Sequence, residues 1–227
     1  MKLNAKIGLI LILSNLGLLI LLAAGLNMMV MPRFEELEQR QLIQHHERLE
    51  RALESDFDEL ARLTRDWGIW DDTYGFMQGR NPDYIDTNIS VETFTNLQLE
   101  TMLLFDTQGR LRHAYTHDPV KHEVIPNLEF KTGNLVAAIT RAEARERQHG
   151  FLVLGGTLYR LAFSRILDNE SVQPLLGHLV MLRRMTSSYG DVLAERTRLS
   201  LSLTNLGREA LTEAQRQAYA ELQNAPY

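Results

Sequence analysis

The residues that could carry chemistry gather in one short segment. Both tryptophans of the chain, Trp67 and Trp70, lie there, and the carboxylates Asp71 and Asp72 follow directly. Adjacent residues on a helix project about 100° apart, so this carboxylate pair is poorly placed for acid/base work on one substrate. Either the pair ends a helix, by capping the turn at residues 73–75 or bonding to the loop that holds Asn81 and Asn88, or it contacts a ligand. We favour the structural role, and the sequence leaves both open.

Large aromatic side chains beside carboxylates suit a folding anchor or a ligand pocket. Trp70 and Tyr74 share one helix face with Asp71. For Asn88 we favour local hydrogen bonds to the loop backbone over contact with a ligand. Tyr159 alternates with Phe163 along a predicted strand, where the pair packs beneath helices or lines a pocket; we favour packing. The candidate ligand-binding residues are Trp70, Asp71, Asp72, Tyr74, Asn88 and Tyr159.

Histidines are the other side chains to weigh, as metal ligands. His45 and His46 are adjacent, whereas a metal pair on one helix face needs a spacing of three or four, so a solvated surface is expected. A later group could suggest zinc, but Pro119 interrupts it. That group is His113, His117 and His122. We therefore predict no metal site and no cofactor.

Motifs of known enzyme classes are absent from this sequence. It contains no G-x-G-x-x-G, P-loop, nucleophile elbow or H-E-x-x-H pattern. It has no cysteine, which excludes disulfides and thiol chemistry. The net charge is -5, with no dense cluster of Lys and Arg, which argues against nucleic-acid binding. We predict that the chain is not an enzyme.

A long helix must position the aromatic segment. Neither Gly nor Pro interrupts residues 34–67, and charged side chains surround one apolar stripe. The stripe is Leu49, Leu53, Phe57, Leu60, Leu63, Trp67 and Trp70. We expect a stalk helix whose C-terminal half packs on its own domain. The N-terminal half could form a coiled-coil seam, and a homodimer is expected.

Beyond the aromatic segment the pattern alternates between strand and helix. We expect a short helical or irregular stretch over 83–97 and a loop over 119–126. Antiparallel strands with helices on one face make an α+β domain. The expected strands are 101–105, 110–116, 150–154, 157–167 and 176–185, with a further one at 199–203. The expected helices are 135–147, 187–196 and 212–222.

The N-terminus predicts a membrane anchor. Residues 7–31 carry no charge, and a helix of that length crosses a hydrocarbon core of about 30 Å. Lys2 and Lys6 precede this run and Glu35 and Glu36 follow it, so the N-terminus should be cytoplasmic and the domain outside. A cleaved signal peptide is the alternative, but its apolar stretch should span only about 7–15 residues. We expect a single-pass protein of the inner (plasma) membrane.

The aromatic segment and the stretch after it resemble a known family, the fourth CHASE-type (CHASE4) extracytoplasmic sensor domain. The shared pattern is W-x-x-W-D-D-x-Y-x-F, then N-x-x-Y-I-x-x-N-I, and it is close over about residues 60–115. The matching residues are Trp67, Trp70, Asp71, Asp72, Tyr74, Phe76, Asn81, Tyr84, Ile85, Asn88, Ile89, Phe94, Leu97, Asp106 and Gly109. Two residues depart from the family pattern: Glu100 replaces an asparagine, which puts a polar contact near the pocket in doubt, and Leu182 replaces a glycine, which concerns packing.

The resemblance implies a PAS/Cache-like antiparallel sheet and a role as the input domain of a bacterial-type transmembrane receptor, periplasmic or extracellular. Its output would be cyclic-di-GMP or kinase signalling from a part of the receptor beyond Tyr227. The ligand would be a small extracytoplasmic molecule or a periplasmic protein. The alternative is a membrane-anchored tethering protein without output. The expected parts are 1–31 (N-terminus and transmembrane helix), 32–72 (stalk), 73–205 (sensor domain) and 206–227 (helical segment).

Overall fold

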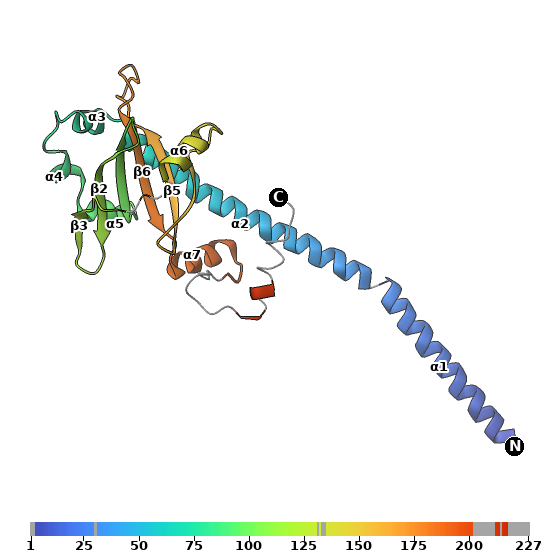
Figure 1. Ribbon diagram of the computed structural model, residues 1–227. Coiled ribbons are helices and arrows are strands. Elements are labelled where there is room, and N and C mark those ends of the chain that lie inside the picture. The colour runs from blue at the N-terminus through green and yellow to red at the C-terminus, as the bar shows by residue number, and fades with distance from the viewer. Residues whose placement is uncertain are drawn as a thin grey trace. The chain divides into compact units, whose positions relative to one another are not determined.

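A computed structural model describes residues 3–29, 31–130, 132, 135–201, 212–213 and 215–217 (Figure 1). The chain divides into two compact units, Met1–Arg51 and Ala52–Tyr227, which are treated separately below. The helix α2 (Met31–Gly68) contributes to both units. The predicted helix at 212–222 lies largely outside the described residues.

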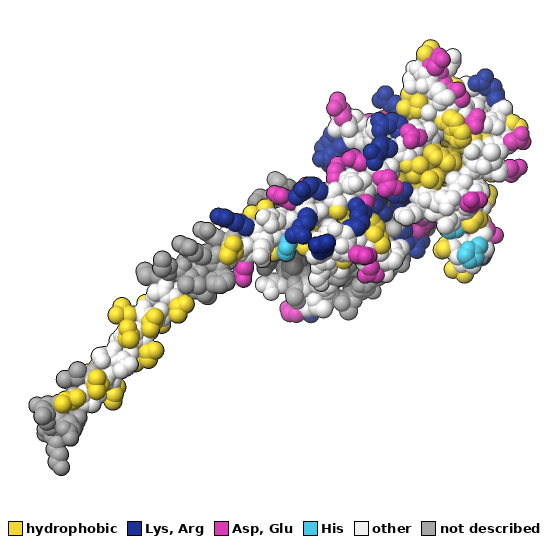
Figure 2. All heavy atoms as spheres, turned by 180° about the vertical axis from the view of Figure 1, so that it is seen from behind, with side chains coloured by type: hydrophobic (Ala, Val, Ile, Leu, Met, Phe, Trp, Pro, Cys, Tyr) yellow, Lys and Arg dark blue, Asp and Glu magenta, His cyan; other side chains and the backbone are white. Residues whose placement is uncertain are grey.

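The first unit contains α1 (Leu3–Met29) and the first part of α2. Figure 2 shows apolar side chains along the coloured part of α1. In the part of the chain that the structure describes, no helix is both long enough and apolar enough to cross a membrane. The transmembrane helix predicted over residues 7–31 is therefore not confirmed.

The second unit begins within α2, whose apolar stripe enters the core. Phe57, Leu60 and Ala61 are buried, as their spacing predicts for a helix that packs on its own domain. The helix ends at Gly68, where an added Cβ would lie 2.8 Å from the carbonyl oxygen of Arg165. The amide of Leu167 donates to the Gly68 carbonyl at 3.1 Å. The end of α2 therefore lies directly against a strand of the sheet.

Six strands form one sheet in the order β3-β2-β1-β6-β5-β4, and every neighbouring pair is antiparallel. The strands are β1 (Thr101–Asp106), β2 (Leu111–Asp118), β3 (Glu123–Pro126), β4 (His149–Leu154), β5 (Thr157–Arg165) and β6 (Gly177–Arg184). The five main predicted strands and the α+β class are confirmed.

Two strand predictions need correction. Residues 119–126 were expected to be a loop, yet β3 pairs with β2, where Ile125 faces Thr116. Its two apolar residues are too short a pattern to mark a strand, and Pro126 is tolerated because β3 is an edge strand. Residues 199–201 of the strand expected at 199–203 are not in a strand, and the others lie outside the described residues.

Short helices complete the domain. They are α3 (Asp71–Met77), α4 (Tyr84–Asn88), α5 (Val91–Asn96), α6 (Leu135–Glu143) and α7 (Ser187–Thr197). The hydroxyl of Ser90 accepts from the amide of Thr93 and caps α5; Thr186 caps α7 in the same way by accepting from Tyr189. The helix predicted over 135–147 ends at Glu143, and Glu146 takes a left-handed conformation in the turn that follows.

Helices cover both faces of the sheet, which corrects the expectation of helices on one face. Met102 and Leu104 pack with residues of α2, α3, α4 and α5. Leu103 and Phe105 point to the other face and pack with α6 (Figure 1). The central strand β1 is therefore buried on both sides. Its continuous apolar run, rather than an alternating one, is the sequence signal of such a strand.

The contact at Gly68 predicts a large effect for a small substitution. Gly68→Ala would force the new methyl group against Ser164 and the Arg165 carbonyl, so we expect it to lower the free energy of unfolding by about 1–3 kcal/mol. Urea unfolding of the purified chain measures this. Gly75→Ala, within α3, is the matched control, because the added Cβ would meet only Asn81, at an ordinary contact distance of 3.7 Å. Equal stability of wild type and Gly68→Ala would contradict this account of the helix end.

Candidate functional site

The aromatic segment forms a compact cluster at the end of α2. Trp67 and Trp70 meet edge to face at 5.7 Å between ring centroids, and Phe76 stacks on Tyr84 at 4.6 Å. The buried Tyr84 hydroxyl lies 2.9 Å from Thr73 Oγ1. Burial raises the pKa of Tyr84 to about 12. The cluster joins α3 and α4 to α2 and therefore forms part of the core.

Two polar residues of the segment hold the loop between β5 and β6 (residues 166–176). Both carboxylate oxygens of Asp71 accept hydrogen bonds from Asn169, one from its amide and one from its side chain, each at 3.0 Å. The Tyr74 hydroxyl donates to the Pro174 carbonyl at 2.9 Å. Asp71 and Tyr74 thus fasten α3 to a loop nearly one hundred positions away in the sequence.

The remaining predicted ligand residues are not gathered into one site. The Asp72 side chain is exposed, and its carbonyl accepts from Asn81 at 3.5 Å. Asn88 donates to the Tyr84 carbonyl at 3.1 Å, the local role favoured from sequence. Tyr159 packs with the α6 face of the sheet, opposite Tyr74. Trp70, Asp71, Asp72 and Tyr74 follow the end of α2 directly, whereas Asn88 ends α4 and Tyr159 lies on the opposite face of the sheet. Ligand contact by any of the six stays a prediction.

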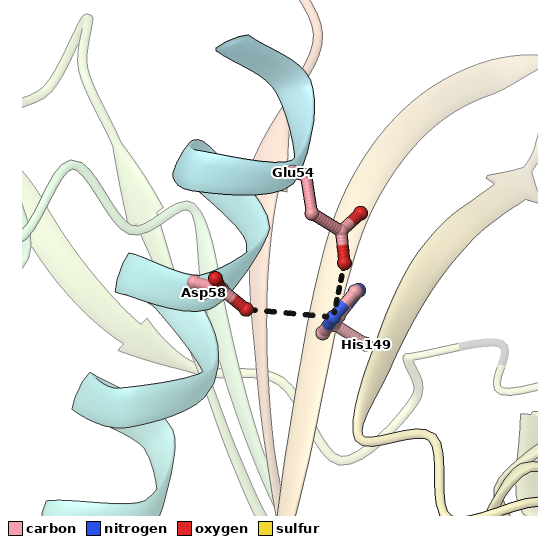
Figure 3. A group of neighbouring side chains, drawn as sticks. All are labelled: Glu54, Asp58 and His149. Atoms are coloured by element: carbon pink, nitrogen blue, oxygen red, sulfur yellow. Dashed lines mark ion pairs between the residues drawn. The ribbon is translucent and has the colours of Figure 1, made fainter. Parts of the chain in front are cut away.

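One group of side chains could hold a metal ion, and sequence reasoning missed it. Glu54 and Asp58 lie one turn apart on α2, and His149 of β4 points between them (Figure 3). His149 Nε2 lies 3.6 Å from a Glu54 oxygen and 4.0 Å from an Asp58 oxygen. These donor types suit zinc, but bonds of about 2.0–2.2 Å would require the three side chains to draw together. The present distances suit direct contact between His149 and the two carboxylates as well.

The three histidines weighed for zinc in the sequence have different surroundings in the structure. His113 packs against Phe76, with ring centroids 4.4 Å apart, and burial lowers its pKa. His117 lies near Phe94 and has a buried Nε2 atom without a hydrogen-bond partner. His122 occupies a left-handed position in the turn before β3.

Two cavities adjoin the face of the sheet that α2 covers. One, of about 750 Å³, lies between α2 and the segment that leads into β4, and exposed side chains such as Arg62, Arg65 and Arg147 line much of it. The other, of about 610 Å³, has buried ionic groups in its lining. We call the second one the arginine cavity, and define it by Asp56, Glu59, Arg160, Arg183, Tyr189 and Arg196. Both volumes suit a small molecule.

A buried carboxylate organises the arginine cavity. Asp56 of α2 accepts from the Tyr189 hydroxyl and from Arg196, both at 2.6 Å, and lies 3.4 Å from Arg160. The Arg160 guanidinium also stacks over the Tyr189 ring at 3.8 Å. Burial raises the pKa of Tyr189 and lowers that of Arg160. Asp56 therefore joins α2 to α7 and to strand β5.

A second ion pair extends the network to β6. Arg183 is buried and donates twice to Glu59 of α2, at 3.1 Å each, and once to the Leu97 carbonyl. Four elements thus meet at one set of charges. Sequence reasoning missed this site because Asp56 and Glu59 read as ordinary members of a charged helix face. Their arginine partners lie more than one hundred positions away.

A family of known protein domains matches most of this chain. The model of the CHASE4 domain matches residues 52–204. This chain belongs to the CHASE4 domain family. The match contains the aromatic segment and every strand of the sheet, so the resemblance seen in the sequence is confirmed.

Individual relatives of this CHASE4 domain are signalling proteins by name. It is 25% identical over 153 residues to the methanogenesis regulatory histidine kinase FilI of Methanothrix harundinacea (strain 6Ac). That alignment covers 66% of this chain and 17% of FilI, so the chain spans a small part of its relative.

A solved structure shares the fold at low sequence identity. The extracellular domain of vpHK1S-Z8, a protein named as a histidine kinase, has a TM-score of 0.52 at 15% identity, over 70% of this chain and 61% of that one. A domain of a sensory box/GGDEF family protein from Vibrio parahaemolyticus gives 0.49 at 13% identity, over 70% and 64% of the two chains. The first likeness shows that this fold occurs in an extracellular domain.

The bonds of Asp71 predict a structural effect at its loop. Asp71→Ala removes two hydrogen bonds to Asn169, and we expect it to lower the free energy of unfolding by about 1 kcal/mol. It should also speed amide hydrogen exchange over residues 168–176. The matched control is Asp72→Ala, which should change stability by less than about 0.5 kcal/mol, because the bond from Asn81 goes to the Asp72 backbone carbonyl and survives the substitution. Equal effects of the two substitutions would contradict the assignment.

Proposed function

We propose that this CHASE4 domain is the extracytoplasmic input domain of a transmembrane signalling receptor. The observation that carries the proposal is the family match over residues 52–204, together with the Asp56 network inside it. In that network one buried carboxylate joins α2, the first helix of the domain, to α7, the last helix of the matched region for which the structure gives bounds. A ligand that favours one arrangement of these helices over another would change the signal by its difference in affinity.

We propose also that α1 anchors the chain in the inner (plasma) membrane, with a cytoplasmic N-terminus. Two observations support this anchor. The described leucines and isoleucines of α1 are 51–72% exposed, although such side chains normally avoid water. Lys2 and Lys6 precede the apolar run and acidic residues follow it, which is the charge bias of an N-terminus that stays inside.

The output of the receptor is proposed to be a histidine kinase. FilI and vpHK1S-Z8 are both named as histidine kinases, and the short share of FilI that is aligned suits an input module. Cyclic-di-GMP output is the variant of this proposal. A tethering protein without output remains the alternative of a different class, and the homodimer stays a prediction.

Membrane topology can be tested with reporter fusions. We expect alkaline phosphatase placed after residue 201 of the full chain to be active, because it needs an extracytoplasmic location, and a fluorescent reporter there to be dark. The control is the double variant Lys2→Glu and Lys6→Glu, which removes the charge bias and should reduce phosphatase activity. A bright fluorescent fusion with inactive phosphatase would overturn the proposed location.

Signalling can be tested by joining the full chain, through an added transmembrane helix that returns the chain to the cytoplasm, to the kinase portion of FilI. Asp56→Asn weakens the link between α2 and α7, so we expect kinase autophosphorylation to change by a factor of about five or more. Asp66→Asn is the matched control, because Asp66 lies on the same helix with an exposed side chain, and it should leave kinase activity unchanged. If neither the wild-type fusion nor either variant has measurable kinase activity in membranes, the tethering alternative is favoured.

A further inference from the structure

One buried donor in the arginine cavity has no hydrogen-bond partner among the residues that the structure describes. Arg160 is 4% exposed, and its Nε atom makes no hydrogen bond. Its Nη1 atom lies 3.4 Å from Asp56, and its guanidinium plane covers Tyr189, so neither contact satisfies the Nε–H group. An unpaired buried donor on a charged group is unfavourable for folding. A feature of this kind in a cavity points to a bound acceptor.

A second unpaired atom lines the same cavity. His117 Nε2 is buried without a partner and comes from β2, whereas Arg160 comes from β5. In the part of the chain that the structure describes, these are the buried side-chain nitrogen or oxygen atoms left without a hydrogen bond. Both belong to the lining of the arginine cavity, so the cavity concentrates unused hydrogen-bonding capacity.

The charges of the lining favour an anion. With neutral histidine, four arginines stand against three carboxylates, which leaves an excess of one positive charge. The basic residues are Arg160, Arg183, Arg184 and Arg196, and the acidic ones are Asp56, Glu59 and Glu100. Asp56 is shared by two arginines and a tyrosine and cannot fully neutralise both. One added negative charge would balance the site, whereas a dianion would face repulsion from the nearby carboxylates.

The rest of the lining is suited to an uncharged, partly apolar body. Phe94, Leu99 and Val192 contribute to the same cavity. A carboxylate presents two oxygens in one plane, which matches the planar donor fork of arginine. An inorganic phosphate carries more charge and has no apolar surface to place on these side chains.

We propose that the arginine cavity binds a small organic monocarboxylate, with its carboxylate on Arg160 and its apolar part against Phe94 and Leu99. The proposal rests on the proposed sensor function and names its ligand class. The bound carboxylate competes with Asp56 for Arg160. Because Asp56 joins α2 to α7, ligand binding acts on the link that the signalling proposal requires.

Isothermal titration of the full chain in detergent tests the proposal. The probes are hexanoate, benzoate and phenylacetate, each compared with its uncharged amide, and inorganic phosphate. We expect saturable binding of at least one carboxylate, no binding of its amide, and no competition by phosphate. Arg160→Lys keeps the charge but loses the planar fork, and should weaken binding at least about tenfold. Arg165→Gln is the control, because Arg165 lies outside the cavity and should leave binding unchanged.

Several outcomes would overturn the proposal. These are the absence of binding by all three carboxylates, equal binding of an amide, preference for phosphate, or full affinity in a folded Arg160→Lys variant. If Arg160→Lys does not fold, Val192→Asp provides the second test, because a carboxylate added to the exposed apolar lining should repel the ligand, and unchanged affinity there counts against the site. Failure of these titrations leaves the topology and kinase experiments to judge the sensor function, because neither depends on which ligand binds.

Discussion

The burial of β1 on both faces is the constraint on which the rest of the domain depends. Met102, Leu103, Leu104 and Phe105 all leave water, in alternate directions. Neither face of the sheet can then remain bare, since apolar burial is the main stabilising contribution. α6 covers one face, while α2 and the short helices after it cover the other. The arginine cavity lies on this second face, where α2 contributes Asp56 and Glu59 to its lining.

The helices and strands could be predicted from the sequence better than the contacts between them. The stripe through Phe57 and Leu60 has a helical period, and the hairpin after β1 has a clear turn, so both could be identified locally. Helices on both faces of the sheet were not predicted, because the short apolar run of β1 does not show which elements cover it. The edge strand β3 was missed because its signal rests on Val124 and Ile125 alone.

The candidate sites show the same limit more strongly. The aromatic segment was recognisable because its residues are contiguous. A structural role for Asp71 was favoured, but its partner Asn169 was not predicted, because it lies in a loop 98 positions away. Asp56, Arg160 and Arg196 look unremarkable one by one in the sequence. Their meaning comes from burial and from long-range contacts, which depend on strand register and on the placement of α7. A single sequence does not contain that information in readable form.

Gly68 has a consequence for how the domain can move. Its backbone lies so close to Ser164 and Arg165 that the end of α2 is held in place, and the bond from Leu167 fixes it along the helix axis. A slide of α2 by one residue, about 1.5 Å, would break this contact. A signal that moves α2 within the domain is therefore expected to tilt or twist the helix about its Gly68 end rather than to slide it along its axis.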